Sequence, residues 1–379
     1  MNPQALEKIK KEFAHIGAFY FNTAYFGPSP YRAKQKVSNA LFKELDPSFY
    51  PYNTWMGISE RIRMQIAQLL EVSADNICHQ SSSADIISIV ANGYPFKTGD
   101  CVVTLAGEYP SDVIPWMLAK KNRGVDFELL DCPELPTVEW LKKNLPEKTK
   151  IFNISHVSFS TGRKVDLVSI GKYLKSKDIL FVVDATQSLG GLKISKAELE
   201  NIDIMTCSAY KWMLGPYGYA FGYFSEKALK LIQHQTGNWI NSINSKNVND
   251  LINYTVETLP GARKFDRGQT PNMLVMACLE ASLELFKELG FDEIQKHNEM
   301  LKKHFLSIYP KQKYDLITPL DAMGNIISLQ TKSIDPQSLE TELKHNYVDV
   351  SVRQGKVRLS FHLFNTKEQV ETLVRSLDI

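Results

Sequence analysis

Between about residues 70 and 230, short apolar runs alternate with amphipathic segments, as expected for the strands of a covered parallel sheet joined by helices. The clearest apolar run, ILFVV at 179–183, ends at Asp184. Further strands are predicted at 101–105, 126–130, 151–154, 204–207 and 219–223. Helices are predicted in the segments ADIISIVANG, SDVIPWMLAKK and LVSIGKYLKSK. This pattern predicts an α/β domain whose ligands lie at the carboxyl ends of its strands.

After about residue 255 the pattern changes. A long helical segment, PNMLVMACLEASLELFKELG, precedes a second one, LKKHFLSIY. Strands are predicted at 326–329 and 357–361, and a final amphipathic helix at 366–377. We therefore expect a large α/β domain over residues 19–255 and a small α+β domain over 256–379, joined by residues 1–18.

Composition narrows the classes of function. The formal charge is only +2, and lysine and arginine are scattered among acids, which argues against a nucleic-acid partner and favours a small molecule. The start of the chain lacks the apolar core of a signal peptide, and no run is apolar enough to span a bilayer, so we expect a cytoplasmic location and no membrane contact. The five cysteines are widely spaced and form no CxxC pair, so neither a disulfide framework nor a metal site is predicted.

Two polar residues follow neighbouring apolar runs. Asp184 follows the run at 179–183, and Lys211 lies between two aromatic residues in SAYKWMLGP, after the run at 204–207. Taken singly, an aspartate there is a common cap and a lysine is usually solvated. Together they suit pyridoxal phosphate (PLP), because a lysine amine forms a Schiff base with its aldehyde and an acid pairs with its pyridinium nitrogen.

A cofactor of this kind needs a phosphate site. The segment QSSSADIISIVANG places Ser81, Ser82 and Ser83 at the start of a predicted helix, where backbone N–H groups and the helix dipole favour an anion. Simple capping of the helix by serine is the alternative interpretation.

Several motifs, in order, resemble the class V aminotransferase family of fold type I PLP enzymes, which includes cysteine desulfurases, selenocysteine lyases, kynureninase and isopenicillin N epimerase. The motifs are YFNTAYFGPSP, EYPSDVIPW, SHVSFSTG, VVDATQSLG, SAYKWMLGPYGYAFGYF, RKFDRGQTPN and VRLSFHLFNTKEQV. The resemblance implies a large domain with a mostly parallel seven-stranded sheet flanked by helices, a smaller C-terminal α+β domain, and PLP as cofactor.

The resemblance also implies roles for individual residues around the cofactor. Lys211 would form the Schiff base, Asp184 would pair with the pyridinium nitrogen, and Gln187 would bond the ring hydroxyl. Tyr109 matches the residue stacked on the ring. The phosphate contacts implied are Ser82, Ser83, Ala84 and Ser208, with Thr270 reaching the phosphate of a neighbouring subunit.

On the substrate side, the resemblance makes Arg358 the residue that grips a substrate carboxylate, with Arg353 as a second candidate. The role given to Thr270 implies at least a homodimer with the active site near the subunit interface. The tyrosine, tryptophan and asparagine residues of 49–57 and 234–244 are candidates for a largely uncharged substrate pocket, although ordinary loops explain them equally well.

Departures from the desulfurase pattern bear on the reaction. No cysteine follows Cys278, whereas desulfurases carry a reactive cysteine shortly before the carboxylate-binding arginine. Phe159 replaces an asparagine, and Tyr109 and Tyr210 replace histidines. These differences disfavour the persulfide route of cysteine desulfurase and selenocysteine lyase, which remains the alternative activity.

The family mechanism implies an external aldimine with a free amino acid or related amine, from which Lys211 removes the α-proton to leave a quinonoid. Transamination, elimination and racemisation all remain open at that point. His156 is either a proton carrier near the cofactor or a structural histidine. A noncatalytic protein that keeps the fold is a further alternative, and a nicotinamide dehydrogenase is disfavoured because SLGG is not a GxGxxG turn.

Overall fold

The fold is taken from a computed structural model that describes residues 1–46, 48, 52–133, 135–270 and 272–378. Its α-helices are α1 Pro3–Glu12, α2 Arg32–Leu45, α3 Tyr52–Leu70, α4 Ser83–Gly93, α5 Ile114–Arg123, α6 Val138–Asn144, α7 Leu167–Ser176, α8 Lys196–Leu199, α9 Glu226–Leu231, α10 Met273–Leu289, α11 Phe291–Ile308, α12 Pro336–His345 and α13 Lys367–Leu377. Its strands are β1 Phe19–Tyr20, β2 Ile77–Gln80, β3 Cys101–Leu105, β4 Asp126–Leu130, β5 Thr149–Ser155, β6 Leu180–Asp184, β7 Ile204–Ser208, β8 Ala220–Phe224, β9 Tyr314–Leu316, β10 Ile326–Thr331, β11 Val348–Asp349, β12 Ser351–Arg353 and β13 Lys356–Ser360.

The main sheet has seven strands in the order β2-β8-β7-β6-β5-β3-β4. Neighbours from β7 to β4 run parallel, and β8 is antiparallel to both β2 and β7. The predicted parallel α/β sheet is therefore confirmed, and β2, which the sequence analysis did not predict, completes it. Parallel strands buried on both faces explain why the runs are continuously apolar.

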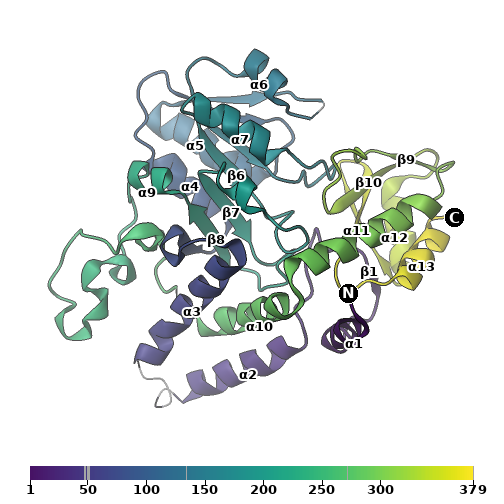
Figure 1. The fold of residues 1–379 in the computed structure, drawn as a ribbon, viewed down its shortest axis with the longest axis horizontal. Coiled ribbons are helices and arrows are strands. Elements are labelled where there is room, and N and C mark those ends of the chain that lie inside the picture. Colours follow the sequence, from purple (N-terminus) through teal and green to yellow (C-terminus); the bar gives the residue numbers. More distant parts are fainter. Residues whose placement is uncertain (47, 49–51, 134, 271, 379) are drawn as a thin grey trace.

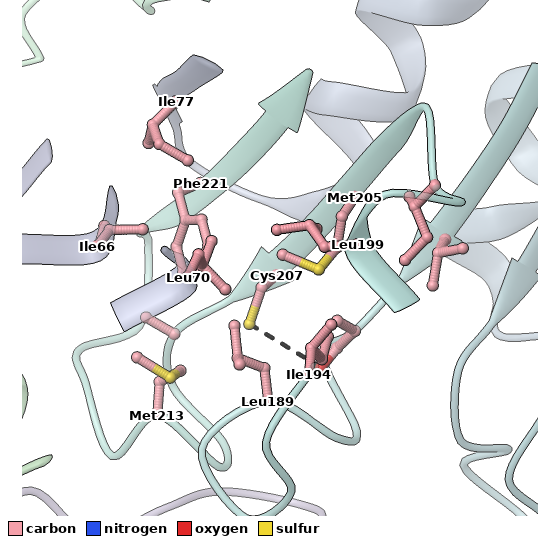
Figure 2. Packing of buried hydrophobic residues seen from close by; sticks show 14 of the residues in the cluster. Ile66, Leu70, Ile77, Leu189, Ile194, Leu199, Met205, Cys207, Met213 and Phe221 are labelled. Carbon is pink, nitrogen blue, oxygen red and sulfur yellow. Dashed lines mark hydrogen bonds between the residues drawn. The ribbon is translucent and has the colours of Figure 1, made fainter. Parts of the chain in front are cut away.

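Alternate residues of each strand serve two separate cores. On β6, Val183 packs with residues of α3, α7 and α10, whereas Val182 packs with residues of α4, α5 and α9. Figure 2 shows part of the first core, in which Cys207 and Met205 of β7 lie among leucine and isoleucine side chains. Because both faces are covered by helices, the polar carboxyl ends of the strands remain as the place where a ligand can enter.

The second sheet is antiparallel, in the order β12-β13-β10-β9, and packs on α11, α12 and α13. Figure 1 shows the two sheets side by side, with α10 and α11 leading from one to the other. The first strand, β1, pairs in parallel with β11, and Asn22 bridges to Ser360, so the segment after β1 lies beside the small sheet. The division at residue 255 stays a prediction.

Candidate active site

A cavity of about 290 Å³ opens where the strands of the main sheet end. Ser155, Asp184 and Ser208 are the last residues of β5, β6 and β7, and all three line it. The full lining is Ser81, Ser82, Ser83, Tyr109, Ser111, Ser155, Phe159, Asp184, Thr186, Gln187, Ser208, Tyr210, Lys211, Tyr217 and Gly218. The turn before α4 formed by Ser81, Ser82 and Ser83, called the serine turn below, thus lines the same cavity as the residues at the ends of the central strands.

Lys211 lies at the centre of this site. Its side chain is only 6% exposed, and its Nζ lies 5.2 Å from the ring centroid of Tyr109 and 5.4 Å from that of Tyr210. Within the described part of the chain, the amine has no hydrogen-bond acceptor or ion-pair partner. Burial and the neighbouring Arg358 lower the pKa of Lys211 to about 8, against the opposing attraction of Asp184. A lysine amine kept this dry is a potential nucleophile and base.

Asp184 lines the cavity and lies among several buried carboxyl groups. Its Oδ1 accepts a hydrogen bond from the backbone N–H of Thr186 at 2.7 Å. Nearby, Asp112 Oδ1 accepts a hydrogen bond from Asn153 Nδ2 at 2.9 Å. Burial raises the pKa of both aspartates. The neighbouring carboxylates of Asp184 and Glu108 raise that of Asp112 further, to well above its ordinary value. A state in which both carboxyl groups are anionic is therefore disfavoured.

The predicted phosphate residues gather at the start of α4. The backbone N–H of Ser83 donates to Ser208 Oγ at 3.2 Å, and the Ser83 and Ser208 hydroxyl oxygens are 3.0 Å apart. Ser82 caps the helix, since its Oγ accepts from the backbone N–H of Asp85. Ala84 lies in the same turn but does not line the cavity.

The predicted ring contacts also line the cavity. Tyr109 is 41% exposed and meets Phe159 edge-on, with ring centroids 5.3 Å apart. Gln187 donates from Nε2 to Ala24 O at 3.0 Å and accepts from Trp212 Nε1 at 2.9 Å, so one amide N–H remains for a ring oxygen.

The two candidate arginines lie on the same face of the small sheet, because Ser351 pairs with Arg358 and Arg353 pairs with Lys356. Arg358 is 2% exposed and donates to Ser351 Oγ and to the carbonyl of Phe159, which lines the cavity. Burial and Arg353 lower the pKa of Arg358 to about 9, and no carboxylate of the described chain pairs with it. Arg353 lies over the ring of Tyr25 and lines a separate cavity.

Other candidates lie apart from the cavity. His156 is buried outside it, with Nε2 4.0 Å from Glu198 Oε1, and burial lowers its pKa to about 4. Thr270 donates to the carbonyl of Arg267 and lines other cavities of the same chain. Of the proposed pocket segments, residues 49–51 lie outside the described residues, and 234–244 contributes to a different cavity.

Sequence reasoning missed Thr186, Ser155 and Asp112. Thr186 and Ser155 adjoin strand ends, so the strand-end rule that singled out Asp184 could have found them. Asp112 gave no such signal, because it lies in the turn before α5 and reaches Asp184 only in the folded chain.

The site fits PLP by its own geometry. A buried amine without a hydrogen-bond acceptor, a carboxylate that lines the cavity and hydroxyl groups at a helix N-terminus match an aldehyde, a pyridine nitrogen and a phosphate. Across the described ranges, no group of three or more histidine, cysteine, aspartate or glutamate residues is arranged to hold a metal ion. None of the helices in those ranges is both long and apolar enough to cross a bilayer. Fold and site together define a PLP-dependent enzyme of fold type I.

Comparisons with known proteins agree. The aminotransferase class-V family model matches residues 52–373, and the chain belongs to this family, whose members use PLP. A probable cysteine desulfurase of Pyrococcus abyssi is 24% identical, over 84% of this chain and 82% of the relative. One from Methanothermobacter thermautotrophicus is 25% identical, over 95% and 94%.

Solved structures show the same fold. An apo cysteine desulfurase from Thermococcus onnurineus has a TM-score of 0.86 at 20% identity, covering 100% of this chain and 98% of that one. A C-DES mutant with glycine covalently linked to its PLP has a TM-score of 0.88 at 17% identity, covering 98% and 99%. The predicted family, fold class and cofactor are thus confirmed.

Proposed function

We propose that this PLP enzyme acts at the α-carbon of a free amino acid or related amine, with Lys211 as the cofactor lysine and proton carrier. The observation that carries the proposal is the Lys211 amine, which is buried, faces the cavity, lacks a hydrogen-bond acceptor in the described chain and has a pKa lowered to about 8. A structural lysine would need a partner for its charge.

The neighbours of Lys211 are suited to hold the cofactor. Ser83 and Ser208 offer hydroxyl groups to the phosphate, and the carboxylate of Asp184 suits the pyridine nitrogen. Ser82 lies in the same turn, with its hydroxyl donating to Asp85. Tyr109 offers its ring beside the cofactor ring. When bound, PLP supplies an electron-withdrawing ring that lowers the cost of charge on the substrate α-carbon.

The chain's own residues then explain proton transfer and substrate orientation. The neutral Nζ of Lys211 accepts the α-proton, and the low pKa keeps a usable fraction of the amine neutral near pH 7.5. Arg358 has Nη2 without an acceptor in the described chain, and a guanidinium suits a substrate carboxylate. Phe159 and Tyr109 line the cavity with aromatic rings that meet edge-on.

C–S bond cleavage on cysteine or cystine is the second candidate, favoured by the relatives called probable cysteine desulfurases and by likeness to C-DES, a cystine C-S lyase. No cysteine lines the cavity among the described residues, and Cys207 packs into the core instead (Figure 2). A route through an enzyme persulfide therefore has no thiol at the site, so elimination is the better form of this candidate.

Two further proposals concern assembly and location. Thr270 does not line the cavity of its own chain, and its predicted role at the site of a second subunit in a homodimer is retained as a proposal from the family resemblance. We retain the cytoplasmic location as a proposal on the grounds of sequence.

The test is the visible absorption spectrum of the PLP-loaded protein before and after a panel of amino acids that includes cysteine and cystine. The wild type should show an imine band that shifts with particular amino acids, and Lys211→Ala should lose the band of the resting enzyme. Borohydride reduction followed by peptide mass spectrometry should place the cofactor on Lys211. Labelling of a different lysine would refute the assignment.

A further inference from the structure

Among the described residues, no cationic side chain other than Lys211 lines the cavity, so the phosphate end has none. Of the described residues that line the cavity, the charged ones are Asp184 and Lys211, and Lys211 is committed to the aldehyde end of the cofactor. A phosphate monoester carries a charge of about −1.5 to −2 at neutral pH. Hydroxyl groups and the start of α4 would have to hold this charge with neutral donors.

A carboxylate makes this end of the cavity still less favourable to an anion. Asp85 lies in the first turn of α4, and its Oδ2 accepts a hydrogen bond from Ser82 Oγ at 2.8 Å. A negative charge one hydroxyl away from the phosphate position offsets part of the positive helix dipole.

Arg267 contacts the serine turn at its first residue, Ser81. Its guanidinium donates to Ser81 Oγ, and Ser81 lines the cavity. In the part of the chain that the structure describes, no carboxylate forms an ion pair with Arg267. Arg267 also lines a small neighbouring cavity that shares Gly218 with the main one.

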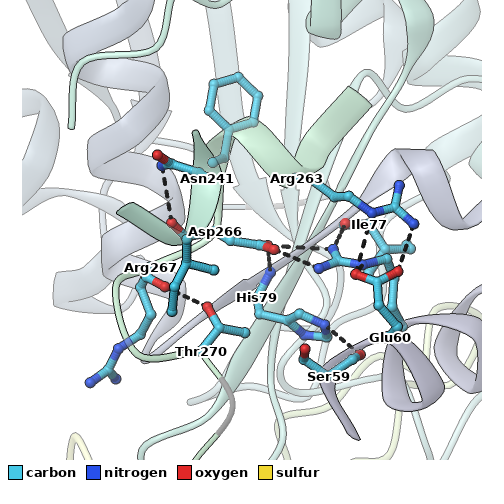
Figure 3. A network of polar contacts seen from close by, with 12 residues as sticks. Ser59, Glu60, Ile77, His79, Asn241, Arg263, Asp266, Arg267 and Thr270 are labelled. Atoms are coloured by element: carbon cyan, nitrogen blue, oxygen red, sulfur yellow. Dashed lines mark hydrogen bonds and ion pairs between the residues drawn. The ribbon is translucent and has the colours of Figure 1, made fainter. Parts of the chain in front are cut away.

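The position of Arg267 is fixed by the backbone around it. Its backbone N–H donates to the carbonyl of His79, two residues before Ser81, at 3.1 Å. The preceding residue, Asp266, accepts from the backbone N–H of His79 at 2.8 Å and pairs with the buried Arg63 at 2.5 Å. Figure 3 shows this network holding the segment with Arg267 and Thr270 against β2. A guanidinium held beside the serine turn, without a carboxylate partner among the described residues, is placed for an anion that arrives from outside.

We propose that Arg267 supplies the positive charge that the phosphate of the cofactor needs, acting at Ser81 and against the opposing charge of Asp85. The inference rests on the proposed function, because it concerns the phosphate group of the same cofactor. It assigns phosphate recognition to a residue outside the serine turn.

The test compares PLP with pyridoxal, which has the same aldehyde and ring but no phosphate. In titrations of the apoprotein, Arg267→Met should bind PLP about 10-fold more weakly than the wild type, the effect of losing one exposed charge-assisted contact. The same variant should bind pyridoxal as tightly as the wild type. Arg267→Lys should retain most of the PLP affinity. Asp85→Asn should bind PLP a few-fold more tightly, with no change for pyridoxal.

One further measurement and a matched control variant distinguish the possible failures. Inorganic phosphate should raise the melting temperature of the wild-type apoprotein and raise it less for Arg267→Met, whether or not PLP binds. Arg61→Met, which removes an exposed arginine near Glu280, is the matched control and should behave as the wild type. Absence of an imine band in the wild type would overturn the proposed function. Equal losses for PLP and pyridoxal, or an unchanged phosphate response in Arg267→Met, would overturn the role of Arg267.

Discussion

The low pKa of Lys211 leads to a prediction about how fast the apoprotein captures an aldehyde. A fall from 10.5 to about 8 corresponds to about 3 kcal/mol of differential interaction between the charged and neutral amine. At pH 7.5 about a quarter of such an amine is neutral, against about one part in a thousand for an ordinary lysine. Burial is the larger cause and Arg358 the second, while Asp184 opposes both.

Two substitutions should therefore move the pKa of Lys211 in opposite directions. Arg358→Met removes a nearby cation, so it should raise the pKa by roughly one unit and slow imine formation near pH 7.5 up to about 10-fold. Asp184→Asn removes a nearby anion and should lower the pKa. The assay is the initial rate of imine formation with pyridoxal as a function of pH, with Lys211→Ala as the blank. The rates of wild type and Arg358→Met should converge above pH 10, where the amine is neutral in both.

The reasoning would be refuted by an apparent pKa near 10.5 in the wild type, or by both variants shifting it in the same direction. Arg358→Lys is the control for charge, because it retains the cation but not the planar guanidinium. It should leave the rate near that of the wild type.

Three further predictions concern the scaffold of the site. Asp266→Asn leaves the 1% exposed guanidinium of Arg63 without its buried anion, so the free energy of unfolding, measured in urea, should fall by about 3 kcal/mol. The double variant Arg63→Met/Asp266→Leu, which removes both charges, should recover most of this loss. A loss no larger than that of an exposed ion pair would contradict this. Burial lowers the pKa of His362 to about 4, so the unfolded chain binds the proton first as the pH falls. The stability contributed by His362 is present above about pH 6.5 and should be lost towards pH 4 by up to about 1.4 kcal/mol per pH unit, and His362→Gln should flatten that slope in urea titrations. Gly190→Ala places a Cβ 2.2 Å from the carbonyl oxygen of Trp212 at a φ of +104°, so both the melting temperature and the affinity for PLP should fall, and unchanged values would contradict the close packing.

Much of the fold could be predicted because its strands are buried on both faces. The run that ends at Asp184 was predicted as a strand because it has five consecutive apolar residues between two helical segments, as a central strand does. Strand β2 was missed because it is short and carries His79 and Gln80. Their polar groups are satisfied by Tyr219 and by the carbonyl of Phe265, which are distant in sequence.

The site likewise contains residues that a local sequence pattern predicts and contacts that it does not. Lys211 and Asp184 could be predicted, because each follows a strand and the chemistry of the pair is specific. The relation of Asp112 to Asp184, and of Arg267 to Ser81, arises only when separate segments pack together. The local pattern of the sequence contains no signal for such contacts, since a charged residue in a turn is ordinarily solvated.

The segment that follows β1 has a consequence for the order in which the protein folds. Asn22 donates to Asp349, 327 positions away, and Gly27 lies so close to the carbonyl of Lys211 that a Cβ there would meet the oxygen at 1.9 Å. Contacts of such separation form late, because the intervening chain must first be ordered. The seven-stranded sheet, whose strands lie between residues 77 and 224, can assemble before this segment docks. During refolding, binding of the cofactor should therefore lag behind the recovery of secondary structure. The time course of cofactor binding would then report when the segment after β1 docks against the C-terminal strands.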